Sequence, residues 1–332
     1  MRRLALPLLA AVILLASCAT PTETPQERLS VLYPEERPFT ESRFVTVSDL
    51  RIHYRAWQPP NPPRAKLLLL HGIGGSTYSF ERLVPELLDA GYAVVAIDLP
   101  GFGYSDPALK FEHTPENRLA LIWTLIDRLD TDNNQFNPVE RWFILGHQMG
   151  GEVALWMAVD RPGRVAGLIL VSTVAGSNRP GGQIAWFPPV RWGLRSWLAN
   201  SLYTEAGVSE LLEDAYGRPP TQEAVNGYLA PLLREDADKA LVQYARTVGP
   251  ETPPLPAVTA PVLMVWGDED TWRSIEEARM QADQVDDVTF EVIEGAGHVP
   301  METHTERFTA IVDQWITGQT LRLRGLTGGA EE

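Results

Sequence analysis

The feature that most constrains the fold is a series of short apolar runs separated by segments with helical spacing. Most of these runs are apolar throughout, as expected for strands buried on both faces. Strands are predicted at 44–47, 51–57, 66–71, 92–98, 141–145, 165–172, 261–267 and 288–294, and helices at 80–90, 115–129, 150–160, 275–282 and 303–317. This alternation indicates an α/β protein with a doubly wound, mostly parallel sheet.

One stretch, residues 176–253, interrupts the alternation because it lacks an apolar strand run and is rich in aromatic residues. We interpret it as a helical cap inserted into a core of residues 41–175 and 254–318, with a tail at 319–332. Ligand sites of open parallel sheets lie at the carboxyl ends of the strands, where this insertion leaves the sheet. A helical appendage with its own small core is the alternative.

Composition excludes several classes of protein. The 28 basic and 43 acidic residues give a net charge of −15, which is unfavourable for a general nucleic-acid binder. The single cysteine, Cys18, excludes an internal disulfide framework and a Cys-based metal cluster. The six histidines lack metal-ligand spacing, and no phosphate-binding glycine loop follows a strand, so we expect no metal and no cofactor.

The N-terminus has the pattern of a secretory signal peptide over residues 1–17. Arg2 and Arg3 precede an apolar run at 4–16, which is shorter than the roughly 20 residues that a spanning helix needs. The segment Leu15-Ala16-Ser17-Cys18 resembles the lipobox of bacterial lipoproteins. That resemblance implies lipid modification of Cys18 and attachment to a membrane of the bacterial envelope, with the outer membrane suspected. Residues 18–40 would then be a tether. An ordinary signal peptide is the alternative.

Glycine-rich and acidic motifs follow several of the predicted strands. They are His71-Gly72-Ile73-Gly74-Gly75, the stretch 98–106, Gly146-His147-Gln148-Met149-Gly150-Gly151, Gly267-Asp268-Glu269-Asp270, and Gly295-Ala296-Gly297-His298-Val299-Pro300. In this order and on these elements, the chain resembles an α/β-hydrolase from about residue 44 to 317.

The resemblance implies a role for each matching residue. His298 corresponds to the general base, and Asp270 to the acid that orients its imidazole, with Asp268 as the neighbouring candidate. The backbone N–H groups of Ile73 and Met149 correspond to the oxyanion hole. His71 is expected to support the oxyanion turn.

Position 148 departs from the family pattern, because glutamine stands where serine hydrolases have their nucleophile. A carboxamide has no hydroxyl or thiol for a base to activate, so an acyl-enzyme at this residue is not expected. Four other serines lie near the motifs, but none is on a strand–helix elbow, and each is interpreted as a turn or capping residue: Ser76, Ser79, Ser105 and Ser172. The flanking glycines predict that Gln148 keeps the positive φ of a nucleophile elbow.

Three interpretations of Gln148 remain open. By resemblance the ancestral activity is hydrolysis of a carboxylic ester or similar bond. The chain could be an inactive pseudo-hydrolase that binds a ligand or partner. It could also be an enzyme in which His298 and Asp270 act on water or a substrate proton without a covalent intermediate. A laboratory substitution is the third explanation, although glutamine is not the usual choice for silencing a serine. The aromatic cap favours a small apolar, ester-like or aromatic ligand.

Overall fold

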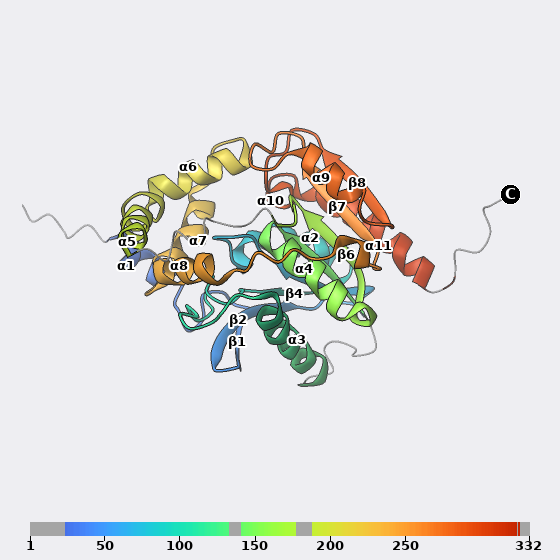
Figure 1. The fold of residues 1–332 in the computed structure, drawn as a ribbon, viewed down its shortest axis with the longest axis horizontal. Coiled ribbons are helices and arrows are strands. Elements are labelled where there is room, and N and C mark those ends of the chain that lie inside the picture. Colours follow the sequence, from blue (N-terminus) through green and yellow to red (C-terminus); the bar gives the residue numbers. More distant parts are fainter. Residues whose placement is uncertain (1–23, 133–140, 177–187, 324, 326–332) are drawn as a thin grey trace, which may run out of the picture.

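The computed structural model describes residues 24–132, 141–176, 188–323 and 325. These contain an eight-stranded sheet, whose twist is visible in Figure 1. Its strands follow the order β1-β2-β4-β3-β5-β6-β7-β8. The first two, β1 and β2, run antiparallel to their neighbours, and the remaining pairs are parallel. The predicted doubly wound, mostly parallel sheet is therefore confirmed. The strand bounds are β1 Ser42–Val47, β2 Leu50–Trp57, β3 Ala65–Leu70, β4 Tyr92–Ile97, β5 Trp142–His147, β6 Val165–Val171, β7 Val262–Gly267 and β8 Val288–Ile293.

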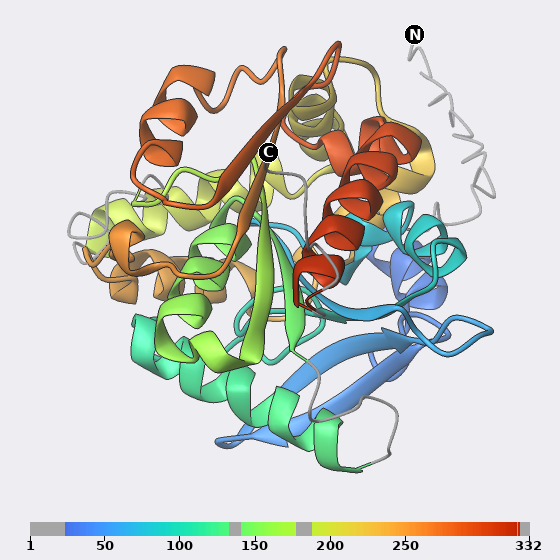
Figure 2. The same ribbon diagram turned by 90° about the vertical axis from the view of Figure 1, so that its right-hand side faces the viewer.

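Helices cover both faces of the sheet, because alternate side chains of each central strand enter different cores. In β3, Leu68 and Leu70 pack into one hydrophobic cluster while Leu67 and Leu69 pack into the other. Full burial of one such leucine stabilises the fold by about 1.5–3 kcal/mol. Figure 2 shows α3 and α11 on opposite sides of the sheet. The first cluster includes side chains of α3 (Pro115–Asp132), α4 (Met149–Asp160) and α9 (Ile275–Ala282), and the second those of α2 (Leu83–Asp89) and α11 (Thr305–Leu323).

Between β6 and β7 the chain forms helices in place of a strand, and these gather at the left of Figure 1. They are α5 (Pro188–Trp197), the π-helical turn η4 (Leu198–Leu202), α6 (Glu205–Tyr216), α7 (Gln222–Leu232) and α8 (Ala237–Thr247). The side chains of Thr204 and Thr221 cap α6 and α7 by accepting from backbone N–H groups. Of the predicted cap, residues 177–187 lie outside the described residues.

Short helical turns complete the connections of the core. They are η1 (Thr77–Phe80), η2 (Pro162–Arg164), η5 (Leu255–Ala257) and α10 (Pro300–Thr303). Helix η1 follows the motif at 71–75 after Ser76, and α10 begins at Pro300, the last residue of the motif at 295–300, so both lie next to motifs at strand ends.

The prediction of a tether over residues 18–40 is wrong for the part that the structure describes. From Thr24 onward the chain is folded, beginning with helix α1 (Pro25–Leu32). Thr24 and Glu27 form a capping box, and Leu29 is only 2% exposed. The Gln26 amide also donates to the carbonyl oxygen of Leu233 in the cap. Residues 1–23, which include the predicted signal peptide and Cys18, lie outside the described residues, so the tether stays a prediction for residues 18–23 only.

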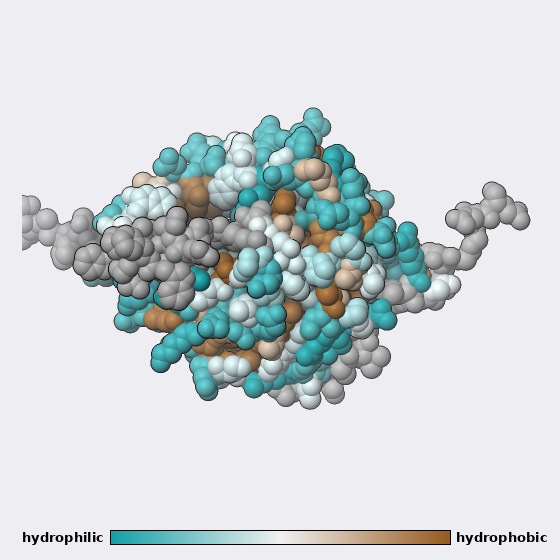
Figure 3. All heavy atoms as spheres, viewed as in Figure 1, coloured by the Kyte–Doolittle hydropathy of each residue, from teal (hydrophilic) through white to brown (hydrophobic). Residues whose placement is uncertain are grey.

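One face of the molecule shows no large apolar patch among the residues that the structure describes. The side in view in Figure 3 is mostly hydrophilic, with small hydrophobic patches scattered over it. Within the described ranges, no helix combines the length and the apolarity needed to cross a membrane.

Candidate active site

The turn from β5 into α4 holds Gln148 in a strained conformation, with φ 49° and ψ −109°. Two glycines make this turn possible. A Cβ atom on Gly146 would lie 2.4 Å from the carbonyl oxygen of Gly150, and one on Gly150 would lie 2.1 Å from that of Leu70. The predicted positive φ is confirmed, at a cost on the order of 1–3 kcal/mol for a non-glycine residue. The backbone of a nucleophile elbow has thus been kept without a nucleophile.

His298, in the loop between β8 and α10, is oriented by Asp270. Its Nδ1 lies 2.9 Å from Oδ2 and 3.1 Å from Oδ1 of that carboxylate. Asp270 is itself fixed by the N–H groups of Trp272 and Arg273, at 2.9 and 3.0 Å. Asp268, the neighbouring candidate, instead accepts from the N–H of Gly295 at 2.7 Å. The structure therefore pairs His298 with Asp270.

The other ring nitrogen of His298, Nε2, is buried and has no hydrogen-bond partner among the described residues. With Asp270 holding the proton on Nδ1, Nε2 of the neutral ring presents a lone pair. The ring of Trp272 covers His298 at 4.7 Å between centroids. Leaving a buried polar atom unpaired costs about 1–3 kcal/mol. A ligand or water that donates a hydrogen bond to Nε2 removes this cost.

The oxyanion turn contains an arrangement that the motif does not reveal. The N–H of Ile73 donates to Oε1 of Gln148 at 3.0 Å. By the family resemblance this N–H is an oxyanion donor, so the side-chain amide occupies the place that the resemblance assigns to a substrate carbonyl oxygen. The second expected donor, the N–H of Met149, belongs to the first residue of α4, directly after Gln148.

Two further histidines lie beside the site and hydrogen-bond to its backbone. His71 is fully buried, donates from Nδ1 to the carbonyl oxygen of Gly72 at 2.7 Å, and accepts at Nε2 from the N–H of Leu99 at 3.0 Å. These bonds fix the oxyanion turn, as expected. His147 donates to the backbone carbonyl of His298 at 3.2 Å. Burial lowers the pKa of both imidazoles, so both rings are neutral.

Gln148 and His298 face the same cavity of about 280 Å³ beneath the cap helices. Most of its walls are apolar, and among the described lining residues none is a lysine or an arginine. The core contributes Gly72, Ile73, Gly74, Gly75, Ser79, His147, Gln148, Trp272, His298 and Val299, and the cap contributes Leu202, Tyr203, Val208, Leu211, Leu212, Ala215, Tyr228, Leu232 and Leu241. The cavity suits a small, largely apolar and uncharged ligand.

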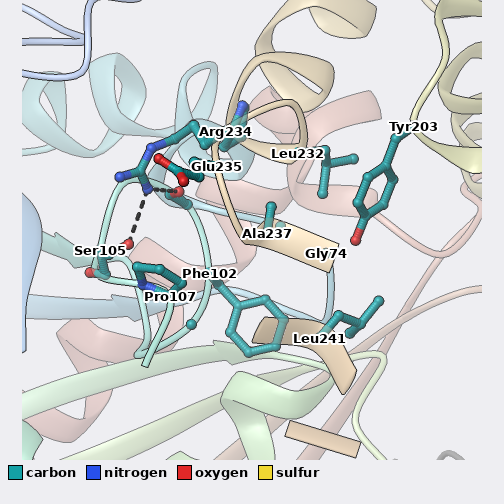
Figure 4. A pocket seen from close by; sticks show the side chains of 14 residues that line it. Gly74, Phe102, Ser105, Pro107, Tyr203, Leu232, Arg234, Glu235, Ala237 and Leu241 are labelled. Carbon is teal, nitrogen blue, oxygen red and sulfur yellow. Dashed lines mark hydrogen bonds between the residues drawn. The ribbon is translucent and has the colours of Figure 1, made fainter. Parts of the chain in front are cut away.

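A smaller cavity of about 30 Å³ adjoins the first and contains Arg234. Figure 4 shows its guanidinium turned toward Ser105 and away from Tyr203 and Leu241. The guanidinium donates to the carbonyl oxygens of Gly103 and Ser105 at 2.8 and 3.0 Å. The guanidinium of Arg234 is therefore already hydrogen-bonded to the loop after β4.

On the outer side, a groove of about 870 Å³ shares Leu202 and Leu211 with the buried cavity. Four carboxylates also line this groove: Glu210, Glu213, Asp214 and Glu269. Their negative charges disfavour the approach of an anionic ligand from this side.

Two parts of the site are not evident from the sequence motifs. Trp272, between Asp270 and the cap, hydrogen-bonds through its indole to Asp214 of α6. Ser79, interpreted as a turn or capping residue, lines the cavity beside Tyr228, whose hydroxyl lies 2.9 Å away. By contrast, Ser76 does cap η1, and Ser105 donates to the carbonyl oxygen of Asp98. The described parts of the chain hold no group of three or more His, Cys, Asp or Glu side chains placed to bind a metal ion.

Comparison with known proteins finds a matching family model and sequence relatives of this chain. A family model described as "Alpha/beta hydrolase family" matches residues 67–311. The uncharacterized hydrolase YugF of Bacillus subtilis (strain 168) is 26% identical over 281 residues, covering 82% of this chain and 97% of that protein. A 2-hydroxy-6-oxononadienedioate/2-hydroxy-6-oxononatrienedioate hydrolase of Cupriavidus pinatubonensis is 28% identical over 287 residues, covering 82% and 93%.

Solved structures share the fold at lower sequence identity. A membrane phospholipase A, described as a bacterial virulence factor, superposes with a TM-score of 0.65 and 22% identity over 89% of this chain and 92% of its own. The serine hydrolase CarC of carbazole degradation gives a TM-score of 0.66 and 21% identity over 83% and 98%. These likenesses bear on the fold alone.

Proposed function

Because the chain belongs to the alpha/beta hydrolase family, we propose that it acts on a small uncharged ligand of ester-like or aromatic character, with His298 as a general base and without a covalent intermediate on residue 148. One observation carries this proposal. The Nε2 atom of His298 is buried at the cavity and has no hydrogen-bond partner in the described part of the chain, while Asp270 holds Nδ1. This is the arrangement expected of a general base that has not yet accepted a proton from its substrate.

In the proposed hydrolysis, Nε2 of His298 takes a proton from a water molecule as the water oxygen attacks the carbonyl carbon of the ligand. The electron pair of the C=O π bond moves to oxygen. When the tetrahedral intermediate collapses, the bond to the leaving group breaks, and the imidazolium returns the proton to it. The N–H groups of Ile73 and Met149 stabilise the oxyanion only after the Gln148 amide has turned away from Ile73.

The cavity argues for a ligand unlike that named for some relatives. The relatives named 2-hydroxy-6-oxononadienedioate hydrolases take, by that name, a dicarboxylate. In this chain the described lining of the cavity has no cationic side chain, Arg234 is engaged by Gly103 and Ser105, and the outer groove carries four carboxylates. We therefore propose an uncharged ligand, because each carboxylate buried there would lack a partner.

A second candidate is a ligand-binding protein without catalytic activity. The hydrogen bond from Ile73 to Gln148 Oε1 favours it, because the amide fills the oxyanion site. The two candidates differ in what His298 does. Hydrolysis of p-nitrophenyl butyrate by the wild type that is lost in His298→Ala supports the general base. Ligand binding with no turnover in either protein supports the second candidate.

Fluorophosphonate labelling checks the absence of a covalent route. We expect no label on the wild-type protein and a label on Gln148→Ser, since only the variant has a hydroxyl at the elbow. A label on any side chain of the wild type would contradict the proposal.

We also propose that the protein is attached to the bacterial envelope through lipid on Cys18. The sequence Leu15-Ala16-Ser17-Cys18 supports this. Six residue steps separate Cys18 from the cap residue Thr24, a reach of at most about 20 Å for an extended chain. The fold would then sit close to the bilayer, with the exposed Val31 and Leu32 of α1 near its surface. Metabolic labelling with palmitate in the wild type, and its loss in Cys18→Ala, tests the attachment.

A further inference from the structure

A chain of hydrogen bonds leads from the cavity wall to a buried carboxyl group that the proposed reaction does not use. Ser79 of η1 and Tyr228 of α7 line the cavity, with the tyrosine hydroxyl 2.9 Å from Ser79 Oγ. The same hydroxyl is bonded to Oε1 of Glu302 in α10. The hydroxyl of Tyr216, at the end of α6, donates to Oε2 at 2.7 Å. Hydrogen bonds thus connect Ser79 to Tyr228 and Tyr228 to Glu302, with Ser79 at the cavity.

Counting protons shows that the two ends of this chain are coupled. Tyr228 has one hydroxyl proton and two partners. When Glu302 is ionised, Tyr228 donates to it and must accept from Ser79, so Ser79 offers only lone pairs to the cavity. When Glu302 is protonated and donates to Tyr228, the tyrosine can donate to Ser79. The serine proton is then free to point into the cavity.

Both protonation states of Glu302 are accessible near neutral pH. Burial raises the pKa of its carboxyl to about 7, against the lowering effects of the hydrogen bonds from Tyr228 and Tyr216 and of the charge of Arg82. From η1, Tyr78 also interacts electrostatically with this carboxyl. A glutamine could bond to both tyrosines without the cost of a buried charge, so holding the cap to the core does not by itself require an acid here.

We propose that Ser79, Tyr228 and Glu302 form a proton-relaying subsite, which binds an uncharged carbonyl oxygen of the ligand and can protonate it. This inference rests on the proposed function, since it supplies an acid to the cavity that contains the base His298. Ser79 is the residue that touches the ligand. Tyr228 and Glu302 act through it as positioning residues.

The relay transfers one proton and changes no oxidation state. The Glu302 proton moves to the oxygen of Tyr228, the tyrosine proton moves to Ser79 Oγ, and the serine proton moves to the ligand oxygen. As water adds to the carbonyl carbon and loses its proton to His298, the π electron pair moves to the ligand oxygen, to which the N–H groups of Ile73 and Met149 donate, and this pair then forms the new O–H bond. The ligand oxygen gains one proton, and Glu302 is left ionised.

Two probes of similar shape test the subsite without depending on turnover. Acetophenone has a carbonyl oxygen and ethylbenzene has none. We expect isothermal titration calorimetry to show acetophenone binding about two- to tenfold more tightly near about pH 6 than near about pH 8.5, the worth of one neutral hydrogen bond. Binding at about pH 7 should be accompanied by proton uptake, seen by comparing buffers of different ionisation enthalpy. Ethylbenzene should bind equally at both pH values.

Variants separate the relay from simple packing. Ser79→Ala and Tyr228→Phe should abolish the pH dependence of acetophenone binding and leave ethylbenzene binding in place. Glu302→Gln should remove both the pH dependence and the proton uptake. Tyr92→Phe is the matched control, because it removes a buried tyrosine hydroxyl that is bonded to a carboxylate, Asp313, outside the cavity. It should behave as wild type. Thermal unfolding of each variant checks that it is folded.

Several outcomes would overturn the subsite. They are acetophenone binding that does not depend on pH, binding that Ser79→Ala does not change, and binding of neither probe. Infrared difference spectra of wild type against Glu302→Gln give an independent check, because a protonated carboxyl band at about pH 6 is required. If this band and the pH-dependent binding are present while no ester is hydrolysed, the subsite stands and the proposed function fails.

Discussion

Replacing Gln148 by alanine removes the amide oxygen from the N–H of Ile73 without supplying a nucleophile. In the wild type a ligand carbonyl must displace this 3.0 Å hydrogen bond before it can use the same donor. One such bond contributes a net of about 0.5–1.5 kcal/mol. Since about 1.4 kcal/mol corresponds to a factor of ten, we expect kcat/KM of Gln148→Ala to rise by about two- to tenfold.

The assay is the steady-state hydrolysis of p-nitrophenyl butyrate by four proteins at one pH. They are the wild type, Gln148→Ala, His298→Ala and the double variant. The gain should vanish in the double variant, because the freed oxyanion donor assists a reaction that still needs the base. An alanine variant that is slower than wild type would refute the reasoning, since it would mean that the amide orients the water. A gain that survives without His298 would remove that residue from the mechanism.

Three further results are expected. Asp270→Asn should reduce hydrolysis to the level of His298→Ala, measured as kcat/KM, because an amide does not hold the Nδ1 proton as the carboxylate does; unchanged activity contradicts the role of Asp270. Gln148→Gly should have a free energy of unfolding up to about 1 kcal/mol higher than Gln148→Ala in urea titrations, since both variants lose the amide bonded to Ile73 and only glycine adopts φ 49° without strain; an equal or lower stability of the glycine variant would contradict a strained elbow. The Glu302 carboxyl has its folded-state pKa raised from 4.5 to about 7, so the folded state holds the proton more tightly and stability is lost as pH rises through this window, by about 3 kcal/mol. Glu302→Gln should flatten this part of the stability–pH curve, and a curve of unchanged slope would assign it to other groups.

The order of the elements could be read from the sequence because each central strand carries its own burial signal. The run Lys66–Leu70 is apolar over four consecutive leucines, and in the structure these enter both cores. The elbow conformation was also predictable, because Gly146 and Gly150 leave room that no other residue would. These signals are local, so one sequence is enough to show them.

The parts that could not be predicted depend on contacts between distant segments. Tyr228 meets Ser79 across 149 positions and Glu302 across 74, and nothing in the local pattern of any of them indicates this. The direction of the Gln148 amide is set by Ile73, 75 positions away. The prediction of a tether over residues 24–40 was wrong for a different reason, because the relevant signal is local. The capping box of Thr24 and Glu27 was present in the sequence but was outweighed by the polar, proline-containing composition around it.

The position of the Gln148 amide explains how the elbow, the oxyanion turn and the His298–Asp270 pair can persist together without a nucleophile. The Gln148 amide oxygen accepts from the N–H of Ile73, which would otherwise be unpaired in an apolar cavity. An unpaired donor of this kind lowers stability by about 1–3 kcal/mol. His298 Nε2 has no such substitute among the described residues. In the site, the N–H donor of Ile73 is therefore already occupied, whereas the acceptor Nε2 of His298 is available to a ligand. A ligand gains most there if it brings a proton to His298, and it gains from the oxyanion turn only if its carbonyl competes with the amide already bound.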